Sequence, residues 1–285
     1  MWWKITAAVV VLAAAGMGLM TLIGVRRWRE ETGALREKME SARVRVVPAT
    51  FDSREIDGFP RPVRRYFNAV LPEGAPLVAA VEVEHRGSFN VSESGEGWKP
   101  FTSTQRVVTR PPGFVWSARV HMAPAMSLSV HDAYVAGEGV LTASLFGLVT
   151  VMEQPPTPEL AHGELMRYFA EGAWYPTALL PSQGVAWEPV DGRRAAATLT
   201  DGETSVRLVF TFDDRGLITT VRSDGRYREV DGAQVPTPWQ GRFWDYRRRD
   251  GMLVPLEGEV AWLLPGGELP YWRGSIRRIT YEYAR

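Results

Sequence analysis

The stretch from Trp239 to Leu264 reads WQGRFWDYRRRDGMLVPLEGEVAWLL. In it, Asp250-Gly251 separates two runs rich in aromatic and aliphatic residues, and an Asp-Gly pair between such runs is the strongest short-range signal for a β-hairpin. The second run, 252–264, carries apolar residues on both of its alternating faces, which is typical of a strand covered on both sides. The stretch therefore predicts two antiparallel strands inside a larger structure.

Turn and strand signals of the same kind extend in both directions from this hairpin. Alternating apolar and polar residues over 81–91 and 116–122 predict strands before residue 157, and about seven strands are expected after Pro181. We expect some eleven or twelve antiparallel strands in one domain over residues 48–285, and a sheet of that size curls or closes. The further turn signals are Asp191-Gly192, Asp201-Gly202 and Asp231-Gly232.

A helix is expected between the two groups of strands, at about 158–180. Thr157 is a good N-cap, and Pro158 suits the first helical turn. Apolar residues follow near 3.6-residue spacing as far as Trp174, and Pro176 is expected to kink or interrupt the helix. The predicted fold class is therefore mainly β (α+β), a large curved antiparallel sheet with one inserted helix.

The first 25 residues predict a membrane anchor. From Ile5 to Val25 there are 21 residues without a charge, which as a helix would span about 31 Å, the thickness of the hydrocarbon core of a bilayer. Trp2, Trp3 and Trp28 flank the run, where interfacial aromatic residues belong. A cleaved signal peptide is the competing interpretation, but the apolar run continues beyond the length of a signal-peptide core. We expect an uncleaved single-pass transmembrane helix.

A charged segment, 26–47, follows the anchor. Its apolar residues Leu35, Met39, Ala42 and Val46 are spaced by four, three and four positions, which is helical spacing. We favour a solvated helical stalk, and a dimer seam is the alternative. The arginines and lysines after the span place the domain in the cytoplasm by the positive-inside rule.

Composition excludes several classes of function. The chain has 33 Lys+Arg, 33 Asp+Glu and no cysteine, so nucleic-acid binding, disulfides, thiolate metal sites and cysteine nucleophiles are not expected. Phosphate-binding glycine loops, the Gly-x-Ser-x-Gly elbow and the His-Glu-x-x-His motif do not occur. A metal site on His121 and His131 is disfavoured because catalytic zinc normally has three protein ligands. We therefore predict no catalytic residue, no metal and no cofactor.

Aromatic residues of the helix and of the late strands are the candidate ligand contacts. Such side chains could line an amphipathic cavity, or they could fill a dry core between helix and sheet. Glu257 and Glu259, two residues apart on one strand face, are candidate polar cavity residues or an acid–base pair. We favour ion pairs with arginines such as Arg242, Arg247 or Arg273. The candidate ligand contacts are Tyr168, Trp174, Tyr175, Trp239, Trp262 and Trp272.

Two resemblances add to these predictions. The segment GRFWDYRRRDGMLVP, residues 241–255, resembles the closing hairpins of the LolA/LppX-like half-barrel superfamily. PVRRYF at 62–67 and WYPTALLPSQGV at 174–185 resemble an uncharacterised bacterial family of membrane-anchored proteins, a likeness that covers nearly the whole chain after residue 50. The first resemblance implies a half-barrel whose hydrophobic cavity, plugged by helices, takes up acyl chains. Unlike the LolA-type carriers, this chain keeps a membrane helix and has no cysteine for lipidation.

The sequence thus predicts a membrane-tethered, non-enzymatic binding protein for a hydrophobic ligand such as a lipid, an acyl chain or the acyl group of a lipoprotein. Two alternatives stay open. One is a membrane-anchored hydrolase that uses Glu257 and Glu259, and the other is an envelope scaffold whose partner docks on an open sheet edge. The expected location is the cell membrane. The charges after the span favour a cytoplasmic domain, and the half-barrel resemblance favours the extracytoplasmic side.

Overall fold

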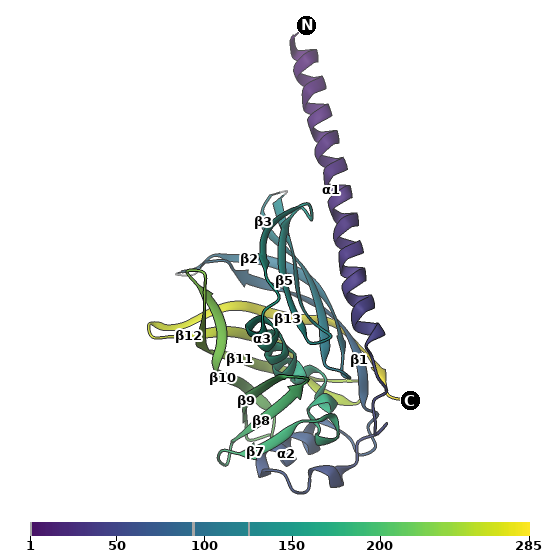
Figure 1. Ribbon diagram of the computed structural model, residues 1–285, viewed down its shortest axis with the longest axis vertical. Helices are drawn as coiled ribbons and strands as arrows, with labels where there is room; N and C mark the ends of the chain where they lie inside the picture. Colours follow the sequence, from purple (N-terminus) through teal and green to yellow (C-terminus); the bar gives the residue numbers. More distant parts are fainter. Residues whose placement is uncertain (1, 93–94, 125) are drawn as a thin grey trace.

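One sheet of thirteen strands dominates the structure (Figure 1). The computed structural model describes residues 2–92, 95–124 and 126–285, apart from the side chains of residues 8–14 and 17. In chain order the strands are β1 (Val78–Asn90), β2 (Trp98–Val108), β3 (Gly113–Ala123), β4 (Met126–Val135), β5 (Glu138–Leu145), β6 (Val149–Gln154), β7 (Ala186–Pro189), β8 (Arg194–Asp201), β9 (Thr204–Phe212), β10 (Ile218–Val230), β11 (Ala233–Arg249), β12 (Met252–Leu264) and β13 (Gly267–Tyr283).

The strands form two meanders, β1–β6 and β7–β13, joined side by side. All of their pairings are antiparallel. The first and last strands, β1 and β13, pair in the middle of the sheet, while β6 and β7 form its two edges. The large antiparallel sheet is therefore confirmed. It is not closed, and it has slightly more strands than the sequence predicted.

The Asp250-Gly251 turn joins β11 to β12, as predicted. These two residues have φ angles of 47° and 84°, the left-handed conformation that both central residues of a type I′ turn require. Asp231 and Gly232, with φ angles of 50° and 78°, form the equivalent turn between β10 and β11. Aspartate and glycine tolerate this conformation better than most residues, which is why the dipeptides identify the hairpins.

A row of glycines lets aromatic rings lie against the concave face of the sheet. Gly258, Gly274 and Gly87 are register partners across β12, β13 and β1. A Cβ atom at Gly274 would lie 2.4 Å from the ring of Trp272, so the indole occupies the space that a side chain would need.

The helix α3 (Pro158–Ala170) connects the two meanders and lies on the concave face (Figure 1). It contacts β3, β4 and β5 of the first meander and β9 and β10 of the second. Thr157 is its N-cap, with Oγ1 accepting a hydrogen bond from the N–H of Leu160 at 3.2 Å. The helix is shorter than predicted. After it, the 3₁₀ turns η2 (Glu171–Trp174), η3 (Pro176–Leu179) and η4 (Pro181–Gln183) complete the segment. Prolines begin the last two turns, where a missing N–H is tolerated.

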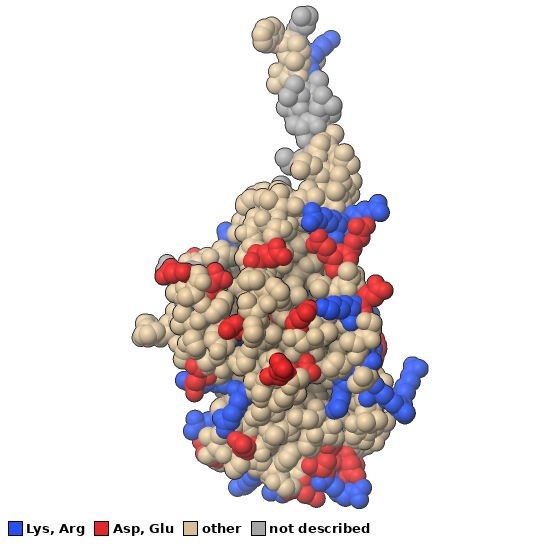
Figure 2. Space-filling model, in the orientation of Figure 1, with Lys and Arg blue, Asp and Glu red and all other residues tan. Residues whose placement is uncertain are grey.

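Two short helices lie between the long N-terminal helix and the first strand of the sheet. They are η1 (Ser53–Ile56) and α2 (Arg61–Val70), which buries Val63 and Tyr66 in the main core. On the outside, Figure 2 shows acidic and basic side chains interspersed over the described surface of one face, in keeping with a formal net charge of zero.

The long helix α1 (Trp2–Ser41) packs its C-terminal part against the convex face, and in Figure 1 its N-terminal part extends beyond the sheet. The indole N–H of Trp28 donates to Oγ of Ser117 at 3.1 Å, and Met39 is buried with Leu35 beside it. The sequence analysis favoured a solvated helical stalk over 26–47. The helix ends at Ser41, and its apolar stripe is a packing surface against the sheet.

Among the described residues, no helix contains a run both long and apolar enough to span a membrane. The predicted span, 5–25, includes residues 8–14 and 17, whose side chains lie outside the described part of the chain. The division into an anchor, a stalk and a β domain stays a prediction.

Candidate functional site

A cavity of about 550 Å³ lies between α3 and the concave face of the sheet. Strands of both meanders and α3 contribute to its wall, which is mostly apolar. Ligand-binding pockets of proteins have volumes of about 300–1,000 Å³, so the cavity is large enough for a small amphiphile. Its aliphatic wall residues include Val120, Leu128, Val130, Leu141, Val260 and Leu269.

Four of the six predicted aromatic contacts line this cavity, namely Trp174, Trp239, Trp262 and Trp272. The indole N–H of Trp239 donates to Oη of Tyr271 at 2.8 Å, and the ring of Trp262 stacks on Tyr271 with centroids 5.7 Å apart. These contacts hold the aromatic wall in place. That the four tryptophans contact a ligand stays a prediction.

Tyr168 and Tyr175, the other two predicted contacts, lie in the packed core outside the cavity wall. Their rings are 5.5 Å apart, and Oη of Tyr175 donates to the carbonyl oxygen of Tyr168 at 2.6 Å. Both side chains are buried. The dry-core alternative therefore describes these two residues.

Glu257 and Glu259 lie on β12 and have different partners. The carboxylate of Glu259 binds Arg242 at 3.0 Å and Arg273 at 2.5 Å, which is the favoured pairing with arginines of neighbouring strands. Glu257 is exposed and accepts a hydrogen bond from the indole of Trp244. Glu259 also lines the cavity, and the carboxylates of both residues accept hydrogen bonds from neighbouring side chains.

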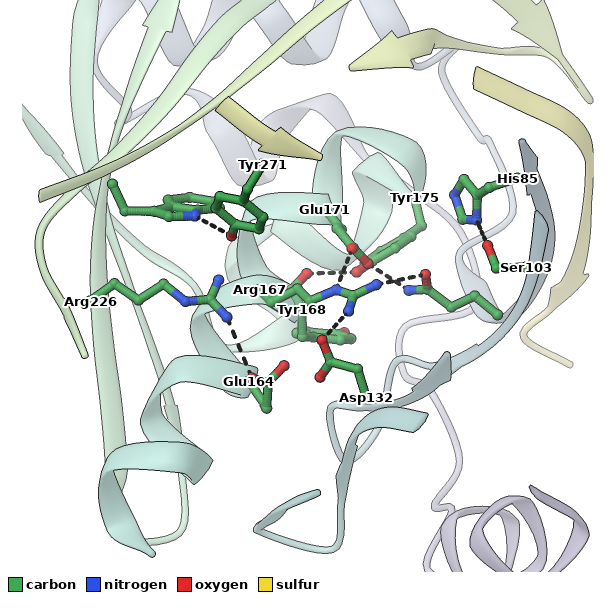
Figure 3. A network of polar contacts seen from close by, with 12 residues as sticks. His85, Ser103, Asp132, Glu164, Arg167, Tyr168, Glu171, Tyr175, Arg226 and Tyr271 are labelled. Atoms are coloured by element: carbon green, nitrogen blue, oxygen red, sulfur yellow. Dashed lines mark hydrogen bonds and ion pairs between the residues drawn. The ribbon is translucent and has the colours of Figure 1, made fainter. Parts of the chain in front are cut away.

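A network of buried charged side chains lies where α3 meets the cavity (Figure 3). At its centre, the guanidinium of Arg167 donates to Oδ2 of Asp132 at 2.5 Å and to Oε1 of Glu171 at 2.8 Å. The same guanidinium lies over the rings of Phe114 and Trp116, 4.8 and 5.0 Å from their centroids. Buried charges are tolerated only when they are paired and hydrogen-bonded, and the central arginine meets both conditions.

Asp132 and Glu164 form a carboxyl pair within this network. Burial and the charge of Asp132 raise the pKa of Glu164 well above its usual value. Burial acts in the same direction on Asp132, but the charge of Arg167 and a hydrogen bond from Glu164 outweigh it, so the pKa of Asp132 is lowered. Glu164 is therefore the member of the pair that holds the proton, because two carboxylates in one dry site do not both ionise readily.

The sequence analysis missed Asp132, Arg167 and Arg226 as parts of this site. One signal was available on α3, where Glu164, Arg167 and Glu171 follow one another at three- and four-residue spacing and so share a helix face. The strand residues carry no comparable signal, because a single aspartate in a strand does not reveal which helix packs on it.

Comparisons with known proteins add a family and two distant resemblances. No curated protein matches the sequence. Among solved structures, the chain is similar to a LolA superfamily protein from Nitrosomonas europaea, with 12% identity and a TM-score of 0.33 over 79% of this chain and 93% of the other. It is also similar to a beta-barrel-like DUF1849 protein from Brucella abortus, with 11% identity and a TM-score of 0.21 over 72% of this chain and 99% of the other.

The family match covers most of the chain. Residues 57–281 match a family of unknown function, DUF6920. This range contains α2, all thirteen strands apart from the end of β13, and α3 with the cavity that it covers. The predicted membership of an uncharacterised family is confirmed, and the protein belongs to DUF6920.

Proposed function

We propose that this protein binds a hydrophobic ligand, such as a lipid, an acyl chain or the acyl group of a lipoprotein, without changing it chemically. The observation that carries the proposal is the aromatic-lined cavity of about 550 Å³ under α3. Each Å² of apolar ligand surface that is transferred from water into such a cavity contributes about 25 cal/mol to the free energy of binding. The cost of immobilising a flexible chain offsets part of this gain.

The proposal includes a tether to the cell membrane through residues 1–25. The uncharged run from Ile5 to Val25 supports it, as do Trp2 and Trp3, whose side chains are exposed at the start of α1. The same helix continues without a break to Trp28, which is packed on the sheet. A tether of this kind would keep the cavity close to the bilayer, where hydrophobic ligands reside.

A scaffold function is the second candidate, because one edge of the sheet is exposed. Strand β6 lies at the edge, and the side chains of Val149 and Val151 on it are 58% and 53% exposed. An exposed edge strand can accept a strand from a partner protein. Val149→Lys would weaken such pairing at a residue that lies outside the cavity wall.

Ligand binding can be tested with the full chain kept soluble in a fluorinated surfactant, whose tails mix poorly with hydrocarbon. A fluorescent fatty acid is titrated into the wild type and into Leu128→Trp, which adds bulk at the cavity wall. Val190→Trp adds the same ring at an exposed position outside the wall and is the matched control.

The proposal predicts saturable binding by the wild type and by the control, and a loss of at least about tenfold in affinity for Leu128→Trp. Organic extraction of the protein as purified, followed by mass spectrometry, identifies the class of any bound lipid. Equal weak binding by all three proteins, together with an extract that contains no lipid, would rule out the carrier function. In that case the scaffold candidate is the one to pursue.

A further inference from the structure

Arg226, on β10, is a positively charged residue of the cavity wall. Its side chain is nearly buried and lies over the ring of Trp239, 5.3 Å from the centroid. Among the described residues, its ion-pair partner is Oε1 of Glu164 at 3.4 Å, which is long for a charge-assisted hydrogen bond. Because Glu164 holds the proton of the carboxyl pair, it offers Arg226 little negative charge.

Two further hydrogen-bond donors lie near Arg226. Arg228 projects from the same face of β10, two residues along the strand. It also lines the cavity, and no described residue forms an ion pair with it. Tyr271, which Figure 3 shows beside Arg226, accepts a hydrogen bond from Trp239 and therefore keeps its own hydroxyl proton for another acceptor. Arg226, Arg228 and Tyr271 thus bring three side chains with N–H or O–H donors to the cavity wall.

The other carboxylates of the cavity wall are already stabilised. The ionised carboxylates of the buried network share Arg167, and Glu259 is held by two arginines of neighbouring strands. Glu159 lies in the first turn of α3, where the helix dipole stabilises a negative charge. Glu229 is exposed and accepts a hydrogen bond from Gln154. The charge of Arg226 also acts on Asp132 through space. Among the described residues, neither Arg226 nor Arg228 forms a hydrogen bond with any of these carboxylates, so both guanidinium groups have N–H donors left for a ligand.

We infer that Arg226 and Arg228 bind the carboxylate of a single-chain amphiphile whose chain lies along Trp239, Trp262 and Trp272. This inference rests on the proposed binding of a hydrophobic ligand and names the class of that ligand. A carboxylate can accept two parallel hydrogen bonds from one guanidinium, and an alcohol cannot. The apolar wall begins directly beside the charge, since Arg226 lies on the ring of Trp239.

The test compares three ligands that have the same chain and different head groups. Dodecanoate, dodecanol and dodecyl phosphate each displace the fluorescent fatty acid from the full chain in fluorinated surfactant. The variants are Arg226→Gln, which removes the deep charge, and Arg226→Lys, which keeps it. Arg222→Gln removes a charge from an exposed arginine of the same strand, paired with Asp224, and is the control.

We expect Arg226→Gln to lower the affinity for dodecanoate by about tenfold or more and to change the affinity for dodecanol less than about twofold. Arg226→Lys, which keeps the charge, should retain part of the affinity for dodecanoate that Arg226→Gln loses. Arg222→Gln should bind both like the wild type. If Arg226→Gln does not fold, Arg228→Gln decides, with a smaller loss expected for dodecanoate alone.

Three results would overturn the inference. The first is equal binding of dodecanoate and dodecanol with no effect of either arginine, which leaves the proposed hydrophobic binding intact. The second is tighter, Arg226-dependent binding of dodecyl phosphate, which assigns the site to a phosphate head group. The third is the absence of any displacement from the wild type, which refutes the proposed function itself.

Discussion

The imidazole of His131 lies flat on the indole of Trp28, with ring centroids 3.7 Å apart and planes 9° from parallel. Its Nε2 atom is 2.7 Å from Oγ1 of Thr32, one turn further along the same helix. Through these two contacts β4 holds α1 on the convex face. The segment after the predicted membrane span is therefore fastened to the sheet and does not hold it at a distance.

This contact predicts a dependence of stability on pH. Burial lowers the pKa of His131 to about 4, whereas an unfolded histidine titrates near pH 6.5. As the pH falls, the unfolded chain takes up the proton first, so stability is lost between about pH 6.5 and pH 4. His131→Phe keeps a stacking ring and cannot be protonated. Between pH 7 and pH 4.5 its free energy of unfolding should therefore fall by about 2 kcal/mol less than that of the wild type.

Urea unfolding at these two pH values, followed by far-ultraviolet circular dichroism, measures the difference. His121→Phe changes an exposed histidine and should behave like the wild type. Equal losses for His131→Phe and the wild type would show that His131 does not couple folding to pH.

Within the buried network, replacement of Arg167 should have the largest effect on the free energy of unfolding. Arg167→Met leaves the carboxylates of Asp132 and Glu171 buried without their cation, and loss of one partner from a buried ion pair costs about 3–5 kcal/mol. Arg215→Met breaks an exposed pair with Asp213 and should cost less than about 1 kcal/mol. Urea unfolding of both variants at pH 7 measures the free energy of unfolding. A loss below about 1 kcal/mol for Arg167→Met would contradict a structural role for the network.

Glu164 should make stability depend on pH in the direction opposite to His131, because burial and the charge of Asp132 raise its pKa. Its raised pKa means that the unfolded chain releases this proton first as the pH rises, so Glu164 destabilises the fold progressively above about pH 4.5. Glu164→Gln keeps the shape of the protonated acid and should gain stability relative to the wild type between pH 4.5 and pH 7. Glu171→Gln, which weakens the contact with Arg167, is the control and should lose stability at pH 7. The prediction fails if Glu164→Gln is destabilised as strongly as the control.

The fold was largely predictable because its signals are local. Asp250-Gly251 and Asp231-Gly232 have the left-handed angles that a two-residue hairpin requires, and such turns are specified by the dipeptide itself. Thr157 caps α3 for an equally local reason. The pairing of β1 with β13 was not predictable in the same way, because no turn joins those strands.

The site was only partly predictable, because burial on one face of a strand does not identify the neighbour. Trp174 and Tyr175 are adjacent in the sequence, but only Trp174 lines the cavity. Arg226 looks like any surface arginine in the sequence. Only the structure shows that α3 packs on its strand and that its ion-pair partner, 3.4 Å away, is Glu164 of that helix.

The glycine row provides a last test, because Gly274 lies against a tryptophan of the cavity wall. Gly274→Ala places a Cβ atom within 2.4 Å of the ring of Trp272, which lines the cavity, so the indole must move. Overpacking of this kind costs about 1–3 kcal/mol, and the displaced ring should also weaken binding of the fluorescent fatty acid. Gly192→Ala is the matched control, since its Cβ would meet no described atom within 4 Å.

Urea unfolding and near-ultraviolet circular dichroism report the two effects of Gly274→Ala separately, as lost stability and as a changed aromatic environment. If Gly274→Ala lowers stability and changes the aromatic signal while the affinity for the fatty acid is unchanged, the tryptophan wall is packing and the ligand binds elsewhere. If affinity falls together with the aromatic signal, and Gly192→Ala changes neither, Trp272 belongs to the binding surface.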